Sequence, residues 1–143
     1  MEMKFMKLAF KQAEKAYKRG EMPVGAIVVK NGKVIGRGYN KKEKTKNAIM
    51  HAEIIAIKKA CKKNNDWRLN NCEMYVTLEP CVMCMGAIVE SRIKKVYCGI
   101  KNNKTHLNNQ QICNDENIEL QYGILENDIL FQVKEFFNDI RNK

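Results

Sequence analysis

The sequence predicts an α/β fold: a three-layer α/β/α sandwich in which helices cover both faces of a mixed central sheet of about five strands. Three observations support this prediction. An amphipathic helical pattern opens the chain, an Asn-Gly hairpin signal follows it, and strand-like and helix-like segments alternate from residue 51 onward. The 143 residues contain no repeat, low-complexity tract or linker. We therefore expect a single domain over residues 1–143.

The first quarter of the chain reads as a helix followed by a hairpin. Apolar residues recur at helical spacing between Met6 and Tyr17, and Gly20 follows where a C-terminal cap belongs. Residues 26–29 are a continuous apolar run that predicts a buried strand. Asn31-Gly32 is a strong signal for a two-residue turn, and the return strand is expected to begin at residues 33–36.

Helices and strands then alternate. A polar stretch over residues 40–47 predicts a loop, and the apolar pattern of residues 54–61 predicts a helix with one face toward the core. Residues 74–77 read as a short strand that leads into a second helix over Cys81–Ser91, with Pro80 at a position that suits a helix start.

The last third is less regular. Residues 96–98 predict another strand, and residues 118–122 alternate like a strand. Between them, residues 101–117 are polar and rich in Asn, so we expect a long loop with at most one short turn of helix. Apolar residues between positions 129 and 140 share one helical face and predict a C-terminal helix.

The chain is strongly basic. Lys and Arg total 26 against 16 Asp and Glu, which gives a net charge of +10. Such an excess attracts polyanions and suits nucleic-acid binding, although a solvated, Lys-rich surface accounts for the charge equally well. Lys predominates over Arg, and Lys contacts phosphates as a point charge rather than reading bases.

The sequence carries no sign of export. No apolar run approaches the length of a membrane span, and Met1–Lys4 lacks the apolar region of a signal peptide. We expect a cytoplasmic protein without membrane contact, in which six cysteines do not form a disulfide framework. Four cysteines without paired spacing are expected to be ordinary thiols: Cys61, Cys72, Cys98 and Cys113.

Two short motifs carry the chemistry. His51, Cys81 and Cys84 offer one imidazole and two thiolates, the ligands that zinc prefers, and three protein ligands leave a fourth position for water. Glu53 is then free to move protons instead of binding metal. The arrangement H-x-E followed by P-C-x-x-C is the pattern of zinc nucleobase deaminases.

Other interpretations of these motifs are weaker. A structural zinc site in an RNA-binding module needs a fourth ligand, for which Cys98, Cys113 and His106 are the candidates, and none has paired spacing. That interpretation also leaves Glu53 without a role. A reduced thiol pair without metal explains neither the histidine nor the glutamate.

Most of the chain, from the first helix to about Gly99 and again in the C-terminal helix, carries motifs of one family. The segments are Met22–Ala26, Gly38–Asn40, His51–Glu53, Trp67–Leu69 and Tyr75–Cys84. They resemble the bacterial tRNA-specific adenosine deaminases, within the cytidine deaminase-like superfamily. The resemblance implies the cytidine deaminase-like fold and a homodimeric enzyme that converts the wobble adenosine of a tRNA anticodon loop to inosine.

The resemblance also implies roles for single residues. His51, Cys81 and Cys84 match the zinc ligands, one zinc per chain, and Glu53 matches the proton shuttle. Asn40 matches a residue that hydrogen-bonds the flipped base, although an Asn at a strand end is by itself more often a turn-former. Three residues are thus candidates for substrate contact: Asn40, Val24 and Asn102.

Two segments depart from the family pattern. In Lys101–Asn109, Asn102 stands where the family usually has Asp, and the glycines of the usual turn are missing. Ala48–Met50 lacks the usual Pro-Thr before His51. Both segments lie where the family grips the anticodon loop, so the resemblance fixes the chemistry more firmly than the substrate.

Three functions are therefore compared below. The first is a tRNA adenosine deaminase that acts on the anticodon stem-loop. The second is a deaminase of a free nucleobase, nucleoside or nucleotide, which needs no polyanion surface. The third is a non-catalytic, zinc-stabilised RNA-binding protein. For the first, we also expect Arg141 and Lys143 to contact RNA phosphates.

Overall fold

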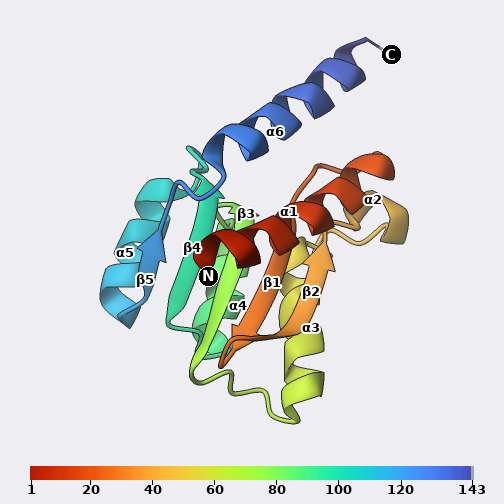
Figure 1. Ribbon diagram of the computed structural model, residues 1–143. Helices are drawn as coiled ribbons and strands as arrows, with labels where there is room; N and C mark the ends of the chain where they lie inside the picture. The colour runs from red at the N-terminus through yellow and green to blue at the C-terminus, as the bar shows by residue number, and fades with distance from the viewer. Residues whose placement is uncertain (143) are drawn as a thin grey trace.

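A computed structural model of the chain describes residues 1–142, and its centre is a mixed sheet (Figure 1). Within these residues the sheet has five strands in the order β2-β1-β3-β4-β5. They are β1 (Gly25–Lys30), β2 (Lys33–Tyr39), β3 (Cys72–Leu78), β4 (Lys95–Ile100) and β5 (Glu119–Gln121). β1 is antiparallel to both β2 and β3, whereas β3, β4 and β5 are parallel. The mixed sheet is as the sequence predicts.

Helices cover both faces of this sheet. They are α1 (Glu2–Lys18), α2 (Lys42–Thr45), α3 (Ala52–Asn64), α4 (Val82–Glu90), α5 (His106–Glu116) and α6 (Glu126–Arg141). In Figure 1, α1 crosses the front of the sheet and α3 and α4 lie behind it, while α6 extends beyond the upper end of the strands. The predicted three-layer α/β/α sandwich is confirmed. Among the helices of residues 1–142, none has the length and apolar composition that crossing a bilayer requires.

The alternation of side chains along the strands divides the core in two. Val28 belongs to the core shared with α3 and α4, whereas Ile27 and Val29 belong to the core under α1 and α6. On the α1 face, Tyr75 stacks on Tyr97 with ring centroids 4.5 Å apart. The apolar run in β1 is therefore buried on both sides, as expected for a central strand between two helical layers.

Two glycines in β2 let α3 lie unusually close to the sheet. A Cβ at Gly36 would stand 2.2 Å from the carbonyl oxygen of Ala56, and one at Gly38 would stand 2.3 Å from that of Ala52. These contacts involve helix backbone, which cannot move aside as a side chain can. The glycines thus fix the position of α3 and of His51, the residue immediately before it.

The region after β4 differs from the sequence prediction. Residues 101–117 were expected to form a long loop, but α5 occupies eleven of them. Its residues are mostly polar and lack helical apolar periodicity, so the pattern from which helices are predicted is missing. Two side chains, Asn109 and Cys113, turn inward and are buried, and these anchor the helix to the rest of the protein.

Smaller differences concern the ends of elements. The predicted loop over residues 40–47 contains the four-residue helix α2, and α6 begins at Glu126, before its first apolar residue. The hairpin turn at Asn31-Gly32 is confirmed, with both residues at positive φ. Lys143, one of the two residues expected to contact RNA phosphates, lies outside the described residues.

We predict that the substitution Gly36→Ala destabilises the protein by about 1–3 kcal/mol or more, because the added methyl group meets the backbone of α3. Urea denaturation of the two proteins measures the difference. Equal unfolding free energies would show that α3 is not held as closely as the contacts indicate.

Candidate metal centre and active site

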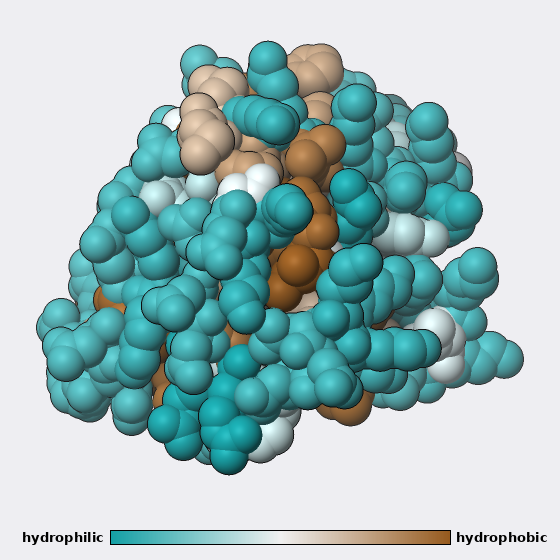
Figure 2. Space-filling model, turned by 60° about the horizontal axis from the view of Figure 1, so that its bottom comes forward, coloured by the Kyte–Doolittle hydropathy of each residue, from teal (hydrophilic) through white to brown (hydrophobic). Residues whose placement is uncertain are grey.

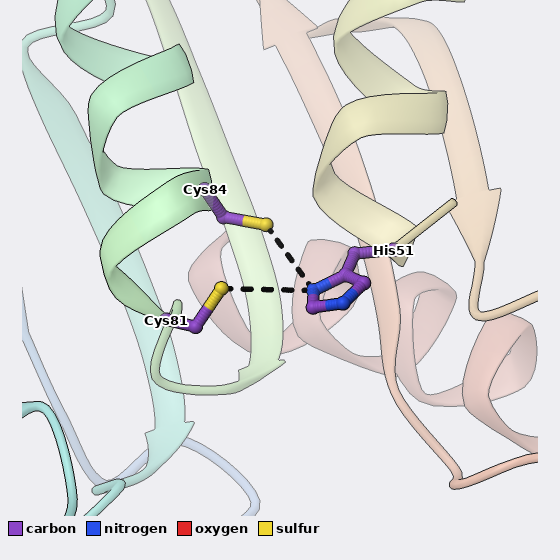
Figure 3. A group of neighbouring side chains, drawn as sticks. All are labelled: His51, Cys81 and Cys84. Carbon is purple, nitrogen blue, oxygen red and sulfur yellow. Dashed lines mark hydrogen bonds between the residues drawn. The ribbon is translucent and has the colours of Figure 1, made fainter. Parts of the chain in front are cut away.

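The predicted metal ligands lie at the starts of two neighbouring helices. His51 is the N-cap residue of α3, and Cys81 is the N-cap residue of α4. Cys84 lies in the first turn of α4, and Figure 3 shows both cysteine side chains directed at the imidazole of His51. Helix N-termini carry unpaired N–H groups and a partial positive charge, which favour thiolate over thiol.

The spacing of the three ligand atoms fits a tetrahedral zinc ion. Nδ1 of His51 lies 3.6 Å from Sγ of Cys81 and 3.6 Å from Sγ of Cys84. Bonds of about 2.3 Å to sulfur and about 2.0 Å to nitrogen at tetrahedral angles imply nitrogen–sulfur separations of about 3.5 Å. The donors therefore have both the chemistry and the spacing that zinc requires, and zinc is the cofactor of this centre.

The described residues offer this cluster three ligands. His51, Cys81 and Cys84 group within 4.8 Å, and none of the candidates for a fourth ligand joins them within residues 1–142. His106 instead contacts Glu79, and the other cysteines are free. A site with three protein ligands is typical of a catalytic zinc, whereas a structural zinc has four.

The two cysteines differ in their acidity. The hydrogen bond between them lowers the pKa of Cys81 to about 5, and the same interaction together with burial raises the pKa of Cys84. One thiolate is thus already favoured at neutral pH, and a metal ion then displaces the proton that the pair still holds.

Glu53 lies in the first turn of α3, two residues after the imidazole ligand. Its side chain is buried, and burial raises the pKa of the carboxyl group to about 7. A carboxyl group with such a pKa can accept a proton and release it near neutral pH. The position suits proton transfer next to the metal centre, and the catalytic role of Glu53 stays a prediction.

These groups line one cavity of about 470 Å³. Its wall includes the candidate metal ligands His51 and Cys81 together with Glu53. All three candidates for substrate contact also line it: Val24, Asn40 and Asn102. The cavity is in the size range of small-molecule sites and accommodates a nucleobase with its sugar.

Asn40 takes part in the structure of the cavity rim. Its side-chain amide donates to the carbonyl of Met22 at 3.3 Å, and its Oδ1 accepts the N–H of Lys42 at 3.1 Å. It is thus a turn-former that also faces the cavity. Its expected contact with a base stays a prediction.

The sequence patterns did not single out two further groups at this site. Phe136, Phe137 and Ile140 of α6 line the cavity, although the first two were noted only as weak support for the resemblance. Tyr17 of α1 helps hold α6 there, because its hydroxyl donates to Asp139. The buried Glu79 was also missed, although it adjoins the Pro80-Cys81 motif, since no periodicity identifies a buried carboxylate.

Comparison with known proteins gives the family. Residues 1–100 match the model of the cytidine and deoxycytidylate deaminase zinc-binding region. The tRNA-specific adenosine deaminase of Bacillus subtilis (strain 168) is 41% identical to the chain, over 97% of this chain and 90% of the relative. The chain belongs to the tRNA-specific adenosine deaminases. The family, the fold and the zinc centre inferred from the motifs are thereby confirmed.

Two solved structures with the same identity to the chain differ in how closely they match its fold. A structure from work on A-to-I editing by tRNA:A34 deaminases at the wobble position of transfer RNA is 34% identical, with a TM-score of 0.82, and the match covers 90% of this chain and 97% of that one. The guanine deaminase of Bacillus subtilis is also 34% identical, but its TM-score is 0.67 and the match covers 73% of this chain and 68% of that one.

We predict that the purified protein contains about one zinc ion per chain and that Cys84→Ala loses most of it. Cys113→Ala is the matched control, because Cys113 is a buried, free cysteine outside the cluster. Atomic absorption measures the metal, and a chelator should lower the Tm of the parent but not of Cys84→Ala. Equal zinc in both variants would contradict the proposed ligand set.

Proposed function

We propose that the protein is a zinc-dependent hydrolytic deaminase that converts the wobble adenosine of a tRNA anticodon loop to inosine and releases ammonia. The observation that supports this most is the cavity in which His51, Cys81 and Glu53 meet, in a chain of the tRNA-specific adenosine deaminase family. His51, Cys81 and Cys84 hold the zinc, and the whole of residues 1–143 serves as one catalytic domain.

The chemistry follows from the groups at the site. Bound zinc supplies the Lewis acidity that lowers the pKa of a water molecule to about 7. Glu53 would accept one proton from the attacking water and give it to ring nitrogen N1 as the water oxygen adds to C6 of adenine. It would then accept the second proton from the hydroxyl group now on C6 and give it to the departing amine. Water and adenosine become inosine and ammonia, and Glu53 returns to its starting state.

The surface around the cavity suits an RNA substrate. Lys42 lines the cavity, and the exposed Lys44 and Lys46 follow it in and after α2. The buried carboxylate of Glu21 accepts the N–H groups of Glu43 and Lys44 at 2.9 and 2.8 Å, which holds this basic segment at the rim. The face seen in Figure 2, where the bottom of the molecule comes forward, is mostly hydrophilic and is crossed by a hydrophobic band. The cations at the cavity rim support contact with the phosphates of an anticodon stem-loop.

A deaminase of a free base, nucleoside or nucleotide is the second candidate, because the same zinc centre serves it and a guanine deaminase is among the structural neighbours. The match to a tRNA deaminase over 97% of this chain and the exposed lysines of and after α2 favour tRNA. The non-catalytic RNA-binding alternative gives Glu53 no role. Because the proposed substrate is tRNA, we place the protein in the cytoplasm.

The proposed enzyme acts as a homodimer. Glu90 is the single charged residue of α4, yet this helix presents Val82, Gly86 and Val89 on one outward face, with Val82 about half exposed. A Cβ at Gly86 would meet no atom within 4 Å, so nothing within the chain requires a glycine there. Glycine in a helix costs about 1 kcal/mol relative to Ala, and close approach of a second copy of α4 explains its presence.

We predict that the zinc-loaded protein forms inosine in the anticodon stem-loop of an arginine tRNA and leaves free adenosine, cytidine and guanine unchanged. Glu53→Gln should keep zinc and RNA binding but lower turnover by about 10²–10⁴-fold. Ammonia release and base analysis measure both, and a stem-loop with guanosine at the wobble position is the control substrate. Turnover of a free base with an inert stem-loop would favour the second candidate function.

We further predict that Gly86→Glu converts the dimer to a monomer, because it places a charge in the centre of the outward face of α4 without disfavouring the helix. Sedimentation velocity measures the change. Phe131→Glu is the control, since Phe131 is 65% exposed on a different helix and is not part of this face. A parent that is already monomeric, or a variant that stays dimeric, argues against an interface at α4.

A further inference from the structure

The carboxylate of Glu79 has no part in the chemistry described above. It lies between the end of β3 and Pro80, and its side chain is 1% exposed. A buried carboxylate is unfavourable unless hydrogen-bond donors surround it. The donors that Glu79 collects all come from one distant part of the chain, and their identity shows what this residue does.

Four groups lie within hydrogen-bond distance of the two oxygens of Glu79. Oε1 accepts the backbone N–H of Asn102 at 3.0 Å and lies 3.1 Å from Nδ1 of His106. Oε2 accepts the side-chain amide of Asn109 at 3.0 Å and the hydroxyl of Tyr122 at 3.2 Å. Nδ1 of His106 also lies 3.1 Å from the hydroxyl of Tyr122, so the imidazole, the phenol and the carboxylate form one cluster.

These donors hold the segment 101–105, which joins β4 to α5. The carbonyl of Asn102 accepts the N–H groups of Thr105 and His106 at 3.1 and 2.9 Å, and its side chain accepts the N–H of Lys104 at 3.1 Å. The segment is thus a compact turn built around Asn102. Asn102 lines the cavity, so the hydrogen bond from its N–H to Glu79 sets where this wall of the cavity stands.

A second set of bonds joins the same turn to Pro80, the residue before the zinc ligand Cys81. The carbonyl of Pro80 accepts the side-chain amide of Asn109 at 2.7 Å and the hydroxyl of Thr105 at 3.2 Å. The turn is therefore bound to the two residues that immediately precede the metal-binding helix. Its position is defined relative to the metal centre and not only relative to the sheet.

The side chain of Asn109 donates to Glu79 and Pro80, although its own oxygen then has no hydrogen-bond partner in the part of the chain that the structure describes. It is fully buried, and within residues 1–142 its Oδ1 finds no hydrogen-bond partner. Rotating the amide would place Oδ1 against Glu79 and the carbonyl of Pro80, two acceptors. The side chain thus leaves one acceptor unpaired in order to donate to both.

We propose that Glu79 is a positioning residue, which fixes the turn 101–105 and with it the place of Asn102 in the cavity wall, and that His106, Asn109 and Tyr122 complete its shell. This rests on the proposed function for its substrate: the wall so held is a binding surface for the anticodon nucleotide. His106 and Asn109 lie in the segment that lacks the glycines of the family pattern. In this chain, hydrogen bonds to Glu79 therefore hold a turn that is usually rich in glycine.

Hydrogen exchange measured by mass spectrometry on the zinc-loaded protein tests the hydrogen bonds without reference to activity. We expect Glu79→Gln and Asn109→Ala to accelerate exchange in residues 101–106 roughly tenfold, with strand β3 and the zinc content unchanged. Tyr122→Phe, which removes one hydroxyl, should have a smaller effect in the same segment. Asn108→Ala is the matched control, because Asn108 is the exposed neighbour of Asn109.

Kinetics on the anticodon stem-loop then separates positioning from general stability. A positioning role raises KM roughly tenfold in Glu79→Gln and leaves kcat nearly unchanged, whereas loss of folded protein lowers the apparent kcat. Unchanged exchange in residues 101–106, or an equal increase in β3, would overturn the proposal. If the parent does not act on the stem-loop, the proposed function fails, and the exchange experiment still decides the role of Glu79.

Discussion

The site depends on the close packing of α3 against β2, because that contact decides where the imidazole ligand stands. Gly36 and Gly38 bring the helix so near the strand that no other side chain fits between them. The imidazole of His51 then lies 3.6 Å from each cysteine sulfur. A shift of α3 by the width of one methyl group would leave separations that a tetrahedral zinc does not accommodate. The packing of α3 against β2 therefore also determines the geometry of the metal centre.

Two buried carboxylates, Glu53 and Glu79, line the same cavity and differ in their surroundings. Glu53 is buried with few donors, and burial raises its pKa to about 7, which suits a group that exchanges protons. Glu79 is equally buried, but donors from Asn102, Asn109 and Tyr122 surround its oxygens, which suits a hydrogen-bond acceptor that holds other groups in place. A glutamate thus suits proton transfer at position 53 and a rigid structural role at position 79. The number of hydrogen-bond donors around each carboxyl group makes the difference.

Much of this could be predicted from the sequence, because periodicity and short motifs are local signals. The hairpin at Asn31-Gly32, the alternation of helices and strands, and the cluster of His51 with Cys81 and Cys84 all follow from short sequence patterns. The helix α5 did not, since it is mostly polar without helical apolar periodicity and depends on Asn109 and Cys113 meeting distant segments. The shell of Glu79 was equally hidden, because its donors lie 23 to 43 residues away in the chain.

The hydrogen bonds of Glu79 and Pro80 explain how segment 101–109 folds without the glycines of the family pattern. A glycine-rich turn folds by backbone freedom alone, whereas the turn 101–105 of this chain is held from outside by Glu79 and by the carbonyl of Pro80. A turn held in this way has fewer conformations open to it before a substrate arrives, so less ordering is needed on binding. The price is dependence on a buried network in which the loss of one donor leaves an acceptor unpaired. On this proposal, the place of Asn102 in the cavity wall depends on the residues around Glu79.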